Sequence, residues 1–483
     1  MEKTNPLHLH IPSPVSPAKS LSRRTFLQLT GTAAAGLALA ACAPAAAPEA
    51  GGAEGAAAGG DVTNLIAWFT DRLTINRMTE ETAIPEFEAA HEGIKVEMQF
   101  VPESELQQKL LTAKAAGNAP DVSSIDETFL DTLTKEEVLL PIPPEVINVN
   151  EEMGSLTADL YRISPTGGEG QYYGLPNGVF AGAIYYNVGL LDELGYTPED
   201  IPTRWDDFIL WAKDVTQWDG DTLARSGFAF YGGNEGSLVG AVRQQLGGPI
   251  DGNQFATKSE TRVGDDIGVQ AYQFMMDFFN VHKTDSIQEG IGSRDRFGAG
   301  NAVTLYNWTW FNGFMDTQYA DIEWGIMPDP TFTGEPVYGN RGPDVGFTVT
   351  SQQENNLDAA FTFYRYLVSP DYLARYCKLR GVQPSLKSMW DSPDFSAESG
   401  AQWAAVAIKN RPENSVDWGF NPRELGDIIG RALPSILDEG EDIATVLKRT
   451  DEEANAFLAA NPQWSILSAA DYEANPQWLT AAG

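Results

Sequence analysis

The chain has 483 residues and carries 67 acidic against 32 basic side chains, which gives a net charge of -35 at pH 7. This excess of negative charge would repel nucleic acid, anionic membrane surfaces and polyanionic ligands. With four histidines and two cysteines, a zinc site or a histidine-dependent catalytic triad has few residues to draw on.

The N-terminus carries the features of an export signal. Arg23 and Arg24 precede a weakly apolar run over 29–41, an order typical of a twin-arginine signal. Because the run is rich in Ala and Gly and shorter than the about 20 apolar residues of a membrane-spanning helix, we interpret it as cleavable. It ends in Leu39-Ala40-Ala41-Cys42, which resembles the lipobox of bacterial lipoproteins. Cys42 is therefore predicted to carry a lipid and to become the new N-terminus.

A tether is predicted between this lipid anchor and the folded body. Residues 43–60 are almost entirely Ala, Gly, Pro and Glu, which leaves too little apolar surface to fold. We interpret them as a disordered segment, with the body beginning at Asp61. The only other cysteine, Cys377, leaves no disulfide in the mature chain and is predicted to be a buried small hydrophobe.

Strand and helix patterns alternate from the start of the body. Residues 65–69 are an apolar strand candidate, 78–90 show helical spacing, and 93–100 alternate like a half-buried strand. A helix over 106–116, closed by Gly117, and a short strand over 121–125 follow. This alternation predicts an α/β fold with a largely parallel sheet. At about 150 residues per domain the body is too long for one domain, and since no linker interrupts it, two interwoven lobes are expected.

Six different short motifs follow one another along the body. They are Phe87-Glu88 before Gly93-Ile94-Lys95-Val96, Ala116-Gly117-Asn118-Ala119-Pro120-Asp121-Val122, Tyr173-Gly174-Leu175-Pro176 before Ile184-Tyr185-Tyr186-Asn187, Trp205-Asp206-Asp207-Phe208, Phe297-Gly298-Ala299-Gly300-Asn301-Ala302-Val303 before Trp308 and Trp310, and Gly381-Val382-Gln383-Pro384-Ser385. Together they resemble the extracellular solute-binding proteins of ABC importers, in the group that contains the maltose- and multiple-sugar-binding proteins.

This resemblance implies two α/β lobes that close on a ligand like a clamshell, joined by crossing hinge strands. On this chain the first lobe would take 61–177 and 330–370, and the second 178–329 and 371–483, with hinge crossings at 174–176 and 327–328. We expect a monomer without enzyme activity or cofactor, exported and anchored by the lipid on Cys42 to the outer face of the cytoplasmic membrane, at the cell surface or in the periplasm. Such a protein would deliver a small ligand, a sugar or oligosaccharide, to the permease subunits of an ABC importer.

Aromatic side chains are the first candidates for the ligand site. Sugar sites combine flat aromatic platforms with Asp, Glu, Asn and Arg, because a pyranose ring has an apolar face and a rim of hydroxyls. By match to the family, Trp308 and Trp310 are platform candidates, and we expect one to face the ligand and the other the core. Trp418 lies where relatives place an aromatic over the ligand, with helix packing as its alternative. Trp68, in the first strand, completes the aromatic candidates.

Polar candidates follow the strands, because ligands of open α/β sheets bind beyond the carboxyl ends of strands. Asp71 follows the first strand, and Asp126 and Glu127 follow the strand over 121–125. Each of these acidic residues could instead be a solvated loop residue or a helix N-cap. Further candidates, placed by loop position or approximate match, are Asn177, Tyr231, Arg341 and Arg423.

Other functions stay open at this point. A glycosidase needs two carboxylates about 5–10 Å apart, and an acidic chain always contains such pairs, although none is singled out. A surface lipoprotein for adhesion or signalling could share the fold. Among other ligands, a polyamine would suit the acidic balance and the aromatics, a peptide is open, and a glycerol phosphate would favour an arginine cluster that is not evident.

Overall fold

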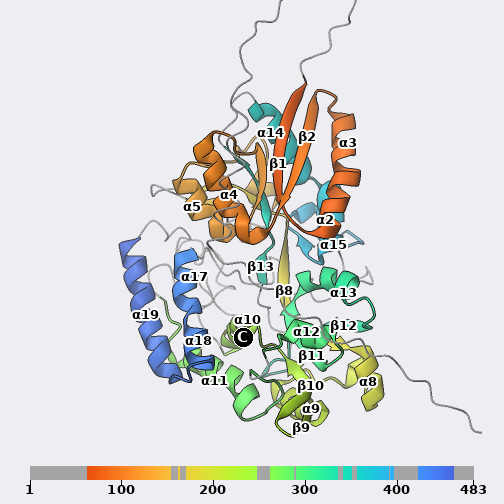
Figure 1. Ribbon diagram of the computed structural model, residues 1–483, viewed down its shortest axis with the longest axis vertical. Coiled ribbons are helices and arrows are strands. Elements are labelled where there is room, and N and C mark those ends of the chain that lie inside the picture. The colour runs from red at the N-terminus through yellow and green to blue at the C-terminus, as the bar shows by residue number, and fades with distance from the viewer. Residues whose placement is uncertain are drawn as a thin grey trace, which may run out of the picture. The chain divides into compact units, whose positions relative to one another are not determined.

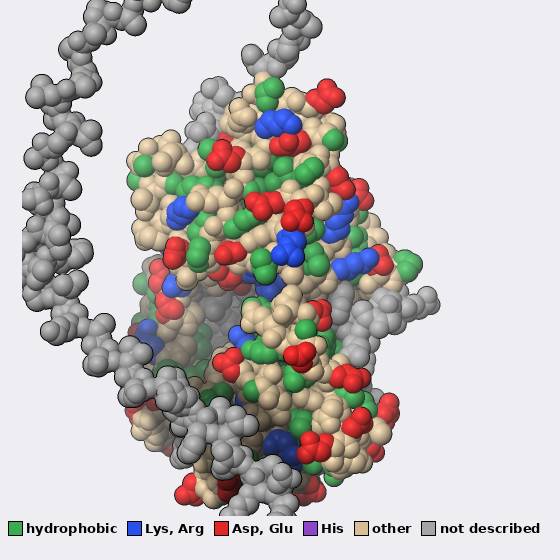
Figure 2. Space-filling view, turned by 45° about the vertical axis from the view of Figure 1, so that its right-hand side comes forward, with side chains coloured by type: hydrophobic (Ala, Val, Ile, Leu, Met, Phe, Trp, Pro, Cys, Tyr) green, Lys and Arg blue, Asp and Glu red, His purple; other side chains and the backbone are tan. Residues whose placement is uncertain are grey.

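The computed structural model describes residues 62–153, 161–163, 170–246, 261–287, 290–334, 341–350, 356–390, 392–395 and 423–461. The predicted export signal, Cys42 and the tether lie outside these residues. Within the described ranges, none of the helices is both long and apolar enough to cross a membrane. The face in Figure 2 carries more acidic than basic side chains and no continuous basic surface, as the net charge leads us to expect.

The first sheet contains the strands that were expected at the start of the body. Its order is β2 (Ile94–Val101), β1 (Thr63–Thr70), β3 (Val122–Ile125), β14 (Gly346–Thr350) and β4 (Leu139–Leu140), with β7 (Leu175–Pro176) paired to β14. β1 runs parallel to β2 and β3, whereas β14 is antiparallel to β3. The predicted α/β fold class is confirmed, but the expected largely parallel sheet is wrong, because β14 joins this sheet from far along the chain and pairs antiparallel with β3, β4 and β7.

Helices cover both faces of the first sheet (Figure 1). Alternate residues of β1 point to opposite sides, so each side of the strand packs against a different set of helices. Trp68 packs on one side against α4 (Glu103–Ala116) and α5 (Leu130–Lys135). α4 ends at Gly117, whose φ of 74° confirms the predicted helix end. Leu65 and Phe69 pack on the other side, in a core shared with α2 (Leu73–Met78), the π-helical turn η1 (Thr79–Ala83), α3 (Ile84–Ala90), α14 (Leu357–Leu367) and α15 (Pro370–Arg380).

The packing of α15 differs from the predicted division of the chain. We expected the second lobe to resume at 371, whereas Cys377 of α15 lies in the same core as Phe69 of β1, and this core extends to Phe395. α15 belongs here because its apolar side is buried against the first sheet. Cys377 is fully buried, which confirms the prediction of a small buried hydrophobe.

The second sheet is built around one long strand, β8 (Gly178–Asn187). Its order is β12 (Trp324–Met327), β8, β11 (Ala302–Trp308), β10 (Thr222–Ala229) and β9 (Gln217–Asp219). β10 and β11 are parallel, and β8 is antiparallel to both β11 and β12. The first residues of β8 pair instead with β13 (Arg341–Pro343) and β15 (Gln383–Pro384).

Helices also cover both faces of the second sheet. The larger core, with the fully buried Trp205 in it, is formed by α8 (Val188–Leu194), α9 (Trp205–Val215), α10 (Glu235–Gln245), α11 (Asp266–Asn280), α18 (Ala432–Leu437) and α19 (Ile443–Ala460). The other face packs against α12 (Ser293–Gly298) and α13 (Asn312–Gln318).

The remaining described elements are short. They are α6 (Val149–Glu152), α17 (Arg423–Gly430), β5 (Arg162–Ile163), β6 (Gln171–Tyr172) and the 3₁₀ turns η2 (Glu127–Phe129), η3 (Pro198–Asp200), η4 (Thr309–Phe311) and η6 (Lys387–Met389). α17 packs on α19.

Within the described ranges, two neighbouring segments connect a strand of one sheet directly to a strand of the other. The first is Asn177, between β7 and β8, whose backbone N–H donates to the Val345 carbonyl at 3.3 Å. The second is 344–345, between β13 and β14, where the Asp344 N–H donates to the Gly178 carbonyl at 2.8 Å. The crossing predicted at 327–328 is therefore wrong, because β13 still pairs with β8 after that point. The other lobe boundaries stay a prediction.

Close packing of β14 on β7 makes a glycine necessary at position 346. A Cβ atom on Gly346 would lie 2.1 Å from the Leu175 carbonyl oxygen and 2.9 Å from the Tyr161 ring. We expect Gly346→Ala to lower the free energy of unfolding by about 1–3 kcal/mol, measured by urea denaturation. Gly93→Ala is the matched control, since nothing lies within 4 Å of its Cβ position. Equal effects of the two substitutions would contradict this packing.

Candidate functional site

A cavity of about 380 Å³ collects side chains from the ends of both sheets. One wall follows β1 and β3 and includes the start of α4, and the opposite wall comes from β8, η4 and α13. The crossing segment before β14 and the end of α15 complete it. The lining residues are Asp71, Arg72, Glu103, Asp126 and Glu127 on the first wall, Phe180, Trp310 and Phe314 on the second, and Pro343, Asp344, Val345 and Arg380 between them.

Three of the predicted polar candidates line this cavity. Asp71 follows β1 directly and accepts a hydrogen bond from the Asn76 side-chain amide at 2.6 Å. Asp126 follows β3 and caps η2, accepting from the Thr128 N–H at 3.0 Å, so it is both an N-cap and a cavity residue. Glu127 is the first residue of η2. Their carboxylates are hydrogen-bond acceptors for the hydroxyl groups of a ligand.

Asp344 is a buried carboxylate held by cations from two distant segments. Its side chain is 1 % exposed, and its Oδ1 lies 3.2 Å from Arg380 Nη2 and 3.6 Å from Arg72 Nη1. The Tyr376 hydroxyl donates to its Oδ2 at 2.7 Å. Burial alone would raise the pKa of Asp344, but Arg380 and Arg72 more than offset this, so the pKa lies below its usual value. Arg72 also pairs with Glu103 at 2.8 Å. The network therefore ties the first wall to the crossing segment.

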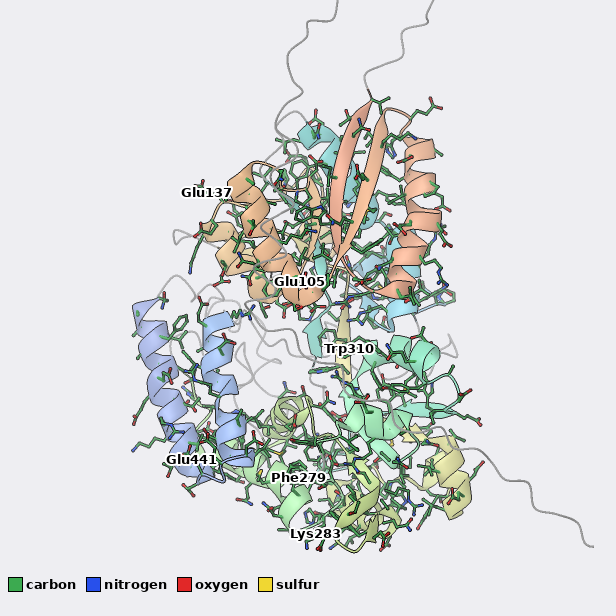
Figure 3. All side chains as sticks on the ribbon, viewed as in Figure 1. Glu105, Glu137, Phe279, Lys283, Trp310 and Glu441 are labelled. Carbon is green, nitrogen blue, oxygen red and sulfur yellow. The ribbon has the colours of Figure 1, made fainter. Side chains whose placement is uncertain are left out.

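Trp310 is the aromatic platform candidate that the structure brings into the cavity. It lies in η4, beside β8 and α13 (Figure 3). The Arg294 and Arg380 guanidinium carbons lie over its ring at 4.8 and 5.1 Å from the centroid. Phe314 packs edge-on against it, with ring centroids 5.9 Å apart. Trp310 is thus held in one orientation by its neighbours.

Trp308 has a different role from Trp310. Its side chain is 7 % exposed and packs edge-on against Phe180, with ring centroids 5.0 Å apart. Residues two apart share a face in a strand, but β11 ends at Trp308 and η4 begins at Thr309, so the backbone turns between the two tryptophans. Of the pair, Trp310 lines the cavity and Trp308 packs in the interior.

Two further aromatic candidates do not line this cavity. Trp68 is 8 % exposed and packs in the core under α4, with the Lys109 ammonium 4.4 Å from its ring centroid. Tyr231, just after β10, packs edge-on against Phe279 with ring centroids 6.1 Å apart. Trp68 does not line the cavity because its large apolar ring is buried in the core beneath α4.

The other polar candidates are also spread over the fold. Asn177 is fully buried in the crossing segment, where its carbonyl accepts from the Ser385 hydroxyl at 3.2 Å. Arg341 is the first residue of β13 and pairs with Ala181 of β8. Arg423 begins α17, and its Nη1 donates to the Gln107 side chain at 3.3 Å.

Two predicted residues cannot be placed, and several lining residues were not predicted. Trp418 and Cys42 lie outside the described residues. Arg72, Glu103, Asp344 and Arg380 form the rest of the charged lining, beside Asp71, Asp126 and Glu127, but carry no motif of their own. Arg72 is next to the predicted Asp71, and Arg380 is next to the Gly381 motif. Only this closeness in sequence could have indicated that the two arginines belong to the site. Within the described ranges, no group of three or more His, Cys, Asp or Glu side chains could hold a metal ion.

Comparison with known proteins identifies the family. Residues 82–402 match the bacterial extracellular solute-binding proteins. The chain is 24 % identical over 347 residues to the arabinooligosaccharide-binding protein of Halalkalibacterium halodurans, covering 70 % of this chain and 74 % of that protein. It is 21 % identical over 411 residues to the lactose-binding protein of Rhizobium radiobacter, covering 83 % and 93 %.

The fold agrees with the sequence match. The maltose/maltodextrin-binding domain MalE from Bdellovibrio bacteriovorus, solved with maltotriose, superposes with a TM-score of 0.65 at 16 % identity, over 82 % of this chain and all of that one. A solute-binding protein from Thermotoga lettingae, solved with tagatose, gives 0.66 at 17 % identity, again over 82 % of this chain and all of that one. The family resemblance inferred from the motifs and the two-lobe fold are therefore confirmed. The chain belongs to the family of bacterial extracellular solute-binding proteins.

Proposed function

We propose that this protein captures a carbohydrate outside the cytoplasm and delivers it to an ABC importer. The observation that carries the proposal is the cavity that Trp310 lines together with Asp71 and Asp126. Relatives named for arabinooligosaccharide and lactose binding support the same ligand class.

The cavity has the chemistry that a pyranose ring requires. Trp310 and Phe314 offer apolar surface to the C–H face of the ring, while Asp71, Asp126 and Glu127 offer acceptors to its hydroxyls. The volume of about 380 Å³ lies within the range of small-molecule sites. Arg72 and Arg380 already face Glu103 and Asp344, so these four charges largely neutralise one another.

Ligand capture would depend on movement at the two crossing segments. Asn177 and 344–345 link the sheets through few residues, and such segments absorb the dihedral changes of a hinge. A ligand that contacts both walls binds the closed arrangement better and shifts the population toward it. The importer would then recognise the closed form. In this proposal the protein binds and releases the sugar without converting it to a product.

Export and anchoring form the second part of the proposal, together with a monomeric state and docking on the permease subunits. In cells of a bacterium with the lipoprotein pathway, we expect wild-type protein to incorporate labelled palmitate and to remain with the membrane fraction. Cys42→Ser removes the thiol that would be alkylated, so the variant should lose the label and appear in the soluble or secreted fraction. Cys377→Ser, at a buried thiol, is the control and should keep the label. Equal labelling of both variants would contradict the anchor.

The ligand class is tested with a thermal-shift screen of the purified protein against mono- and oligosaccharides, polyamines, glycerol phosphates and peptides. A ligand that binds only the folded state raises the melting temperature. A shift with a sugar that is recovered unchanged supports the proposal. Conversion of the sugar to products would favour a glycosidase, and a shift only with another class would replace the proposed ligand.

A further inference from the structure

Arg294 occupies an unusual place for an arginine in this protein. It lies in α12, and its guanidinium carbon lies 4.8 Å from the centroid of Trp310 and 6.0 Å from that of Phe311. Its Nη2 donates a long hydrogen bond of 3.4 Å to the Asn234 side-chain carbonyl. The half-buried guanidinium is therefore next to the ring that forms part of the cavity wall.

The more deeply buried arginines are each close to a carboxylate. The pairs are Arg72–Glu103 at 2.8 Å, Arg243–Asp265 at 2.5 Å, Arg296–Asp285 at 4.0 Å and Arg380–Asp344 at 3.2 Å. In the described part of the chain, Arg294 has no carboxylate within 4.0 Å, and its buried Nε has no hydrogen-bond acceptor. Burial lowers the pKa of Arg294, and the neighbouring charges of Tyr319, Asp295 and Glu235 offset this effect only in part. A partly buried charge of this kind is costly unless something pairs with it.

Three residues at this end of the second sheet have a buried polar group without a hydrogen-bond partner among the described residues. Asn234 is fully buried, and because its carbonyl faces Arg294, the Nδ2 group is the one left without an acceptor among the described residues. Asn307 has the same arrangement, since its carbonyl accepts from the Trp308 N–H at 2.8 Å and its Nδ2 has no acceptor there. The Ser293 hydroxyl is also buried without a described partner. Such groups cost free energy unless a ligand or water supplies the missing hydrogen bonds.

These groups share one edge and one face of the second sheet. β10 and β11 are parallel, so the segments that follow them, with Asn234 and Trp310, lie at the same edge. Leu305 of β11 packs with Phe297 of α12, and Asn307, two residues further along the strand, points to the same face. Arg294, from the first turn of α12, joins them through its contacts with Asn234 and Trp310.

We propose that Arg294 and Asn234 bind a carboxylate of the ligand, so that the protein prefers sugars that carry a uronic acid over their neutral counterparts. This inference rests on the proposed function. A guanidinium and an amide N–H can both donate to one carboxylate, and Arg is suited to that planar group. The hydroxyls of the same sugar would donate to Asp71 and Asp126, which line the cavity together with Trp310. A carboxylate fits better than a phosphate, because its single negative charge matches the single positive charge of Arg294.

The test compares matched pairs of sugars by titration calorimetry on the whole protein. The pairs are digalacturonate with galactobiose, cellobiouronate with cellobiose, and galacturonate with galactose, and galactose phosphate is added as a separate anion. For at least one pair we expect the acidic sugar to bind wild type at least about tenfold more tightly than the neutral one, an advantage that falls as salt is raised. Arg294→Gln should remove most of this preference, so that the acidic and the neutral sugar of a pair bind the variant with similar affinities.

Two further variants complete the design. Asn234→Asp keeps the shape of the side chain but adds a negative charge, so it should weaken binding of the acidic sugar far more than of the neutral one. This variant also provides the test if Arg294→Gln fails to fold, which its melting temperature would reveal. Arg431→Gln is the control, because Arg431 is 58 % exposed and pairs with Glu453 of α19. It should leave both affinities unchanged.

The outcomes separate this inference from the proposed function. If wild type binds neutral sugars as tightly as their acidic partners, the inference is overturned and carbohydrate capture stands. An acidic preference that survives both Arg294→Gln and Asn234→Asp would overturn the assignment to these residues. Tighter binding of galactose phosphate than of galacturonate would overturn the claim that the site prefers a carboxylate to a phosphate. Failure of every sugar, neutral and acidic, would overturn the proposed function together with the inference.

Discussion

Replacing Trp310 with alanine is expected to weaken carbohydrate binding by ~30-fold, or about 2 kcal/mol, because a sugar ring would lose the apolar surface on which it packs. Trp310 lines the cavity and is fixed there by Phe314 and by the guanidinium groups of Arg294 and Arg380. Since the side chain is only half-buried, the melting temperature of the free protein should change little. Titration calorimetry with the sugar found by the thermal-shift screen measures the effect.

Trp218→Ala is the matched control for this loss. Trp218 lies in β9 of the second sheet, is 37 % exposed, and does not line the cavity with Trp310. Its substitution should leave the affinity within about twofold of wild type. If Trp310→Ala folds normally and binds the sugar as wild type does, Trp310 is not the sugar platform and the ligand binds elsewhere in the protein.

Asp344→Ala is expected to lower the free energy of unfolding by about 3–5 kcal/mol, because it leaves the buried cations without their carboxylate. Arg380 lies 3.2 Å and Arg72 3.6 Å from Asp344, and the Tyr376 hydroxyl also loses its acceptor. Urea unfolding measures the effect. The control is Asp394→Ala, at a carboxylate that is 55 % exposed and pairs with Lys378 at 2.7 Å. Exposed pairs of that kind contribute about 0–1 kcal/mol.

The contribution of Asp344 should also depend on pH with a definite sign. Its pKa in the folded protein is held below the usual value, despite burial, by Arg380 and Arg72. The unfolded chain therefore takes up the proton first, at a pKa of about 3.9, so the stabilisation is complete above that pH and declines below it. We expect the stability difference between wild type and Asp344→Asn to be constant near neutral pH and to shrink below about pH 4. A difference that grows as the solution is acidified would contradict the ion-pair account.

Local pattern predicted the elements around the cavity well. The apolar run of β1, the alternation in β2 and the helix that ends at Gly117 are properties of neighbouring residues, and the structure confirms them. Because those strands are parallel, the rule that ligands bind beyond their carboxyl ends led to Asp71 and Asp126, which both line the cavity.

The pattern could not assign roles where a segment's neighbours come from elsewhere in the chain. Trp308 and Trp310 look equivalent in sequence, and the change from β11 to η4 between them separates their roles. Trp68 looked suited to a ligand, yet α4 covers it. No sequence pattern pointed to Arg294. What distinguishes it is its environment in the folded protein, where its buried Nε has no described hydrogen-bond acceptor.

The fold class, the family and the acidic strand ends of the candidate site could all be predicted from the residue pattern, since they depend on periodicity and on motif order along the chain. The pattern did not predict that β14 joins the first sheet, that α15 packs beside it, or that Asp344 pairs with Arg72 and Arg380. The physical reason is that burial and ion pairing act between segments distant in sequence, and their geometry exists only after the chain has folded.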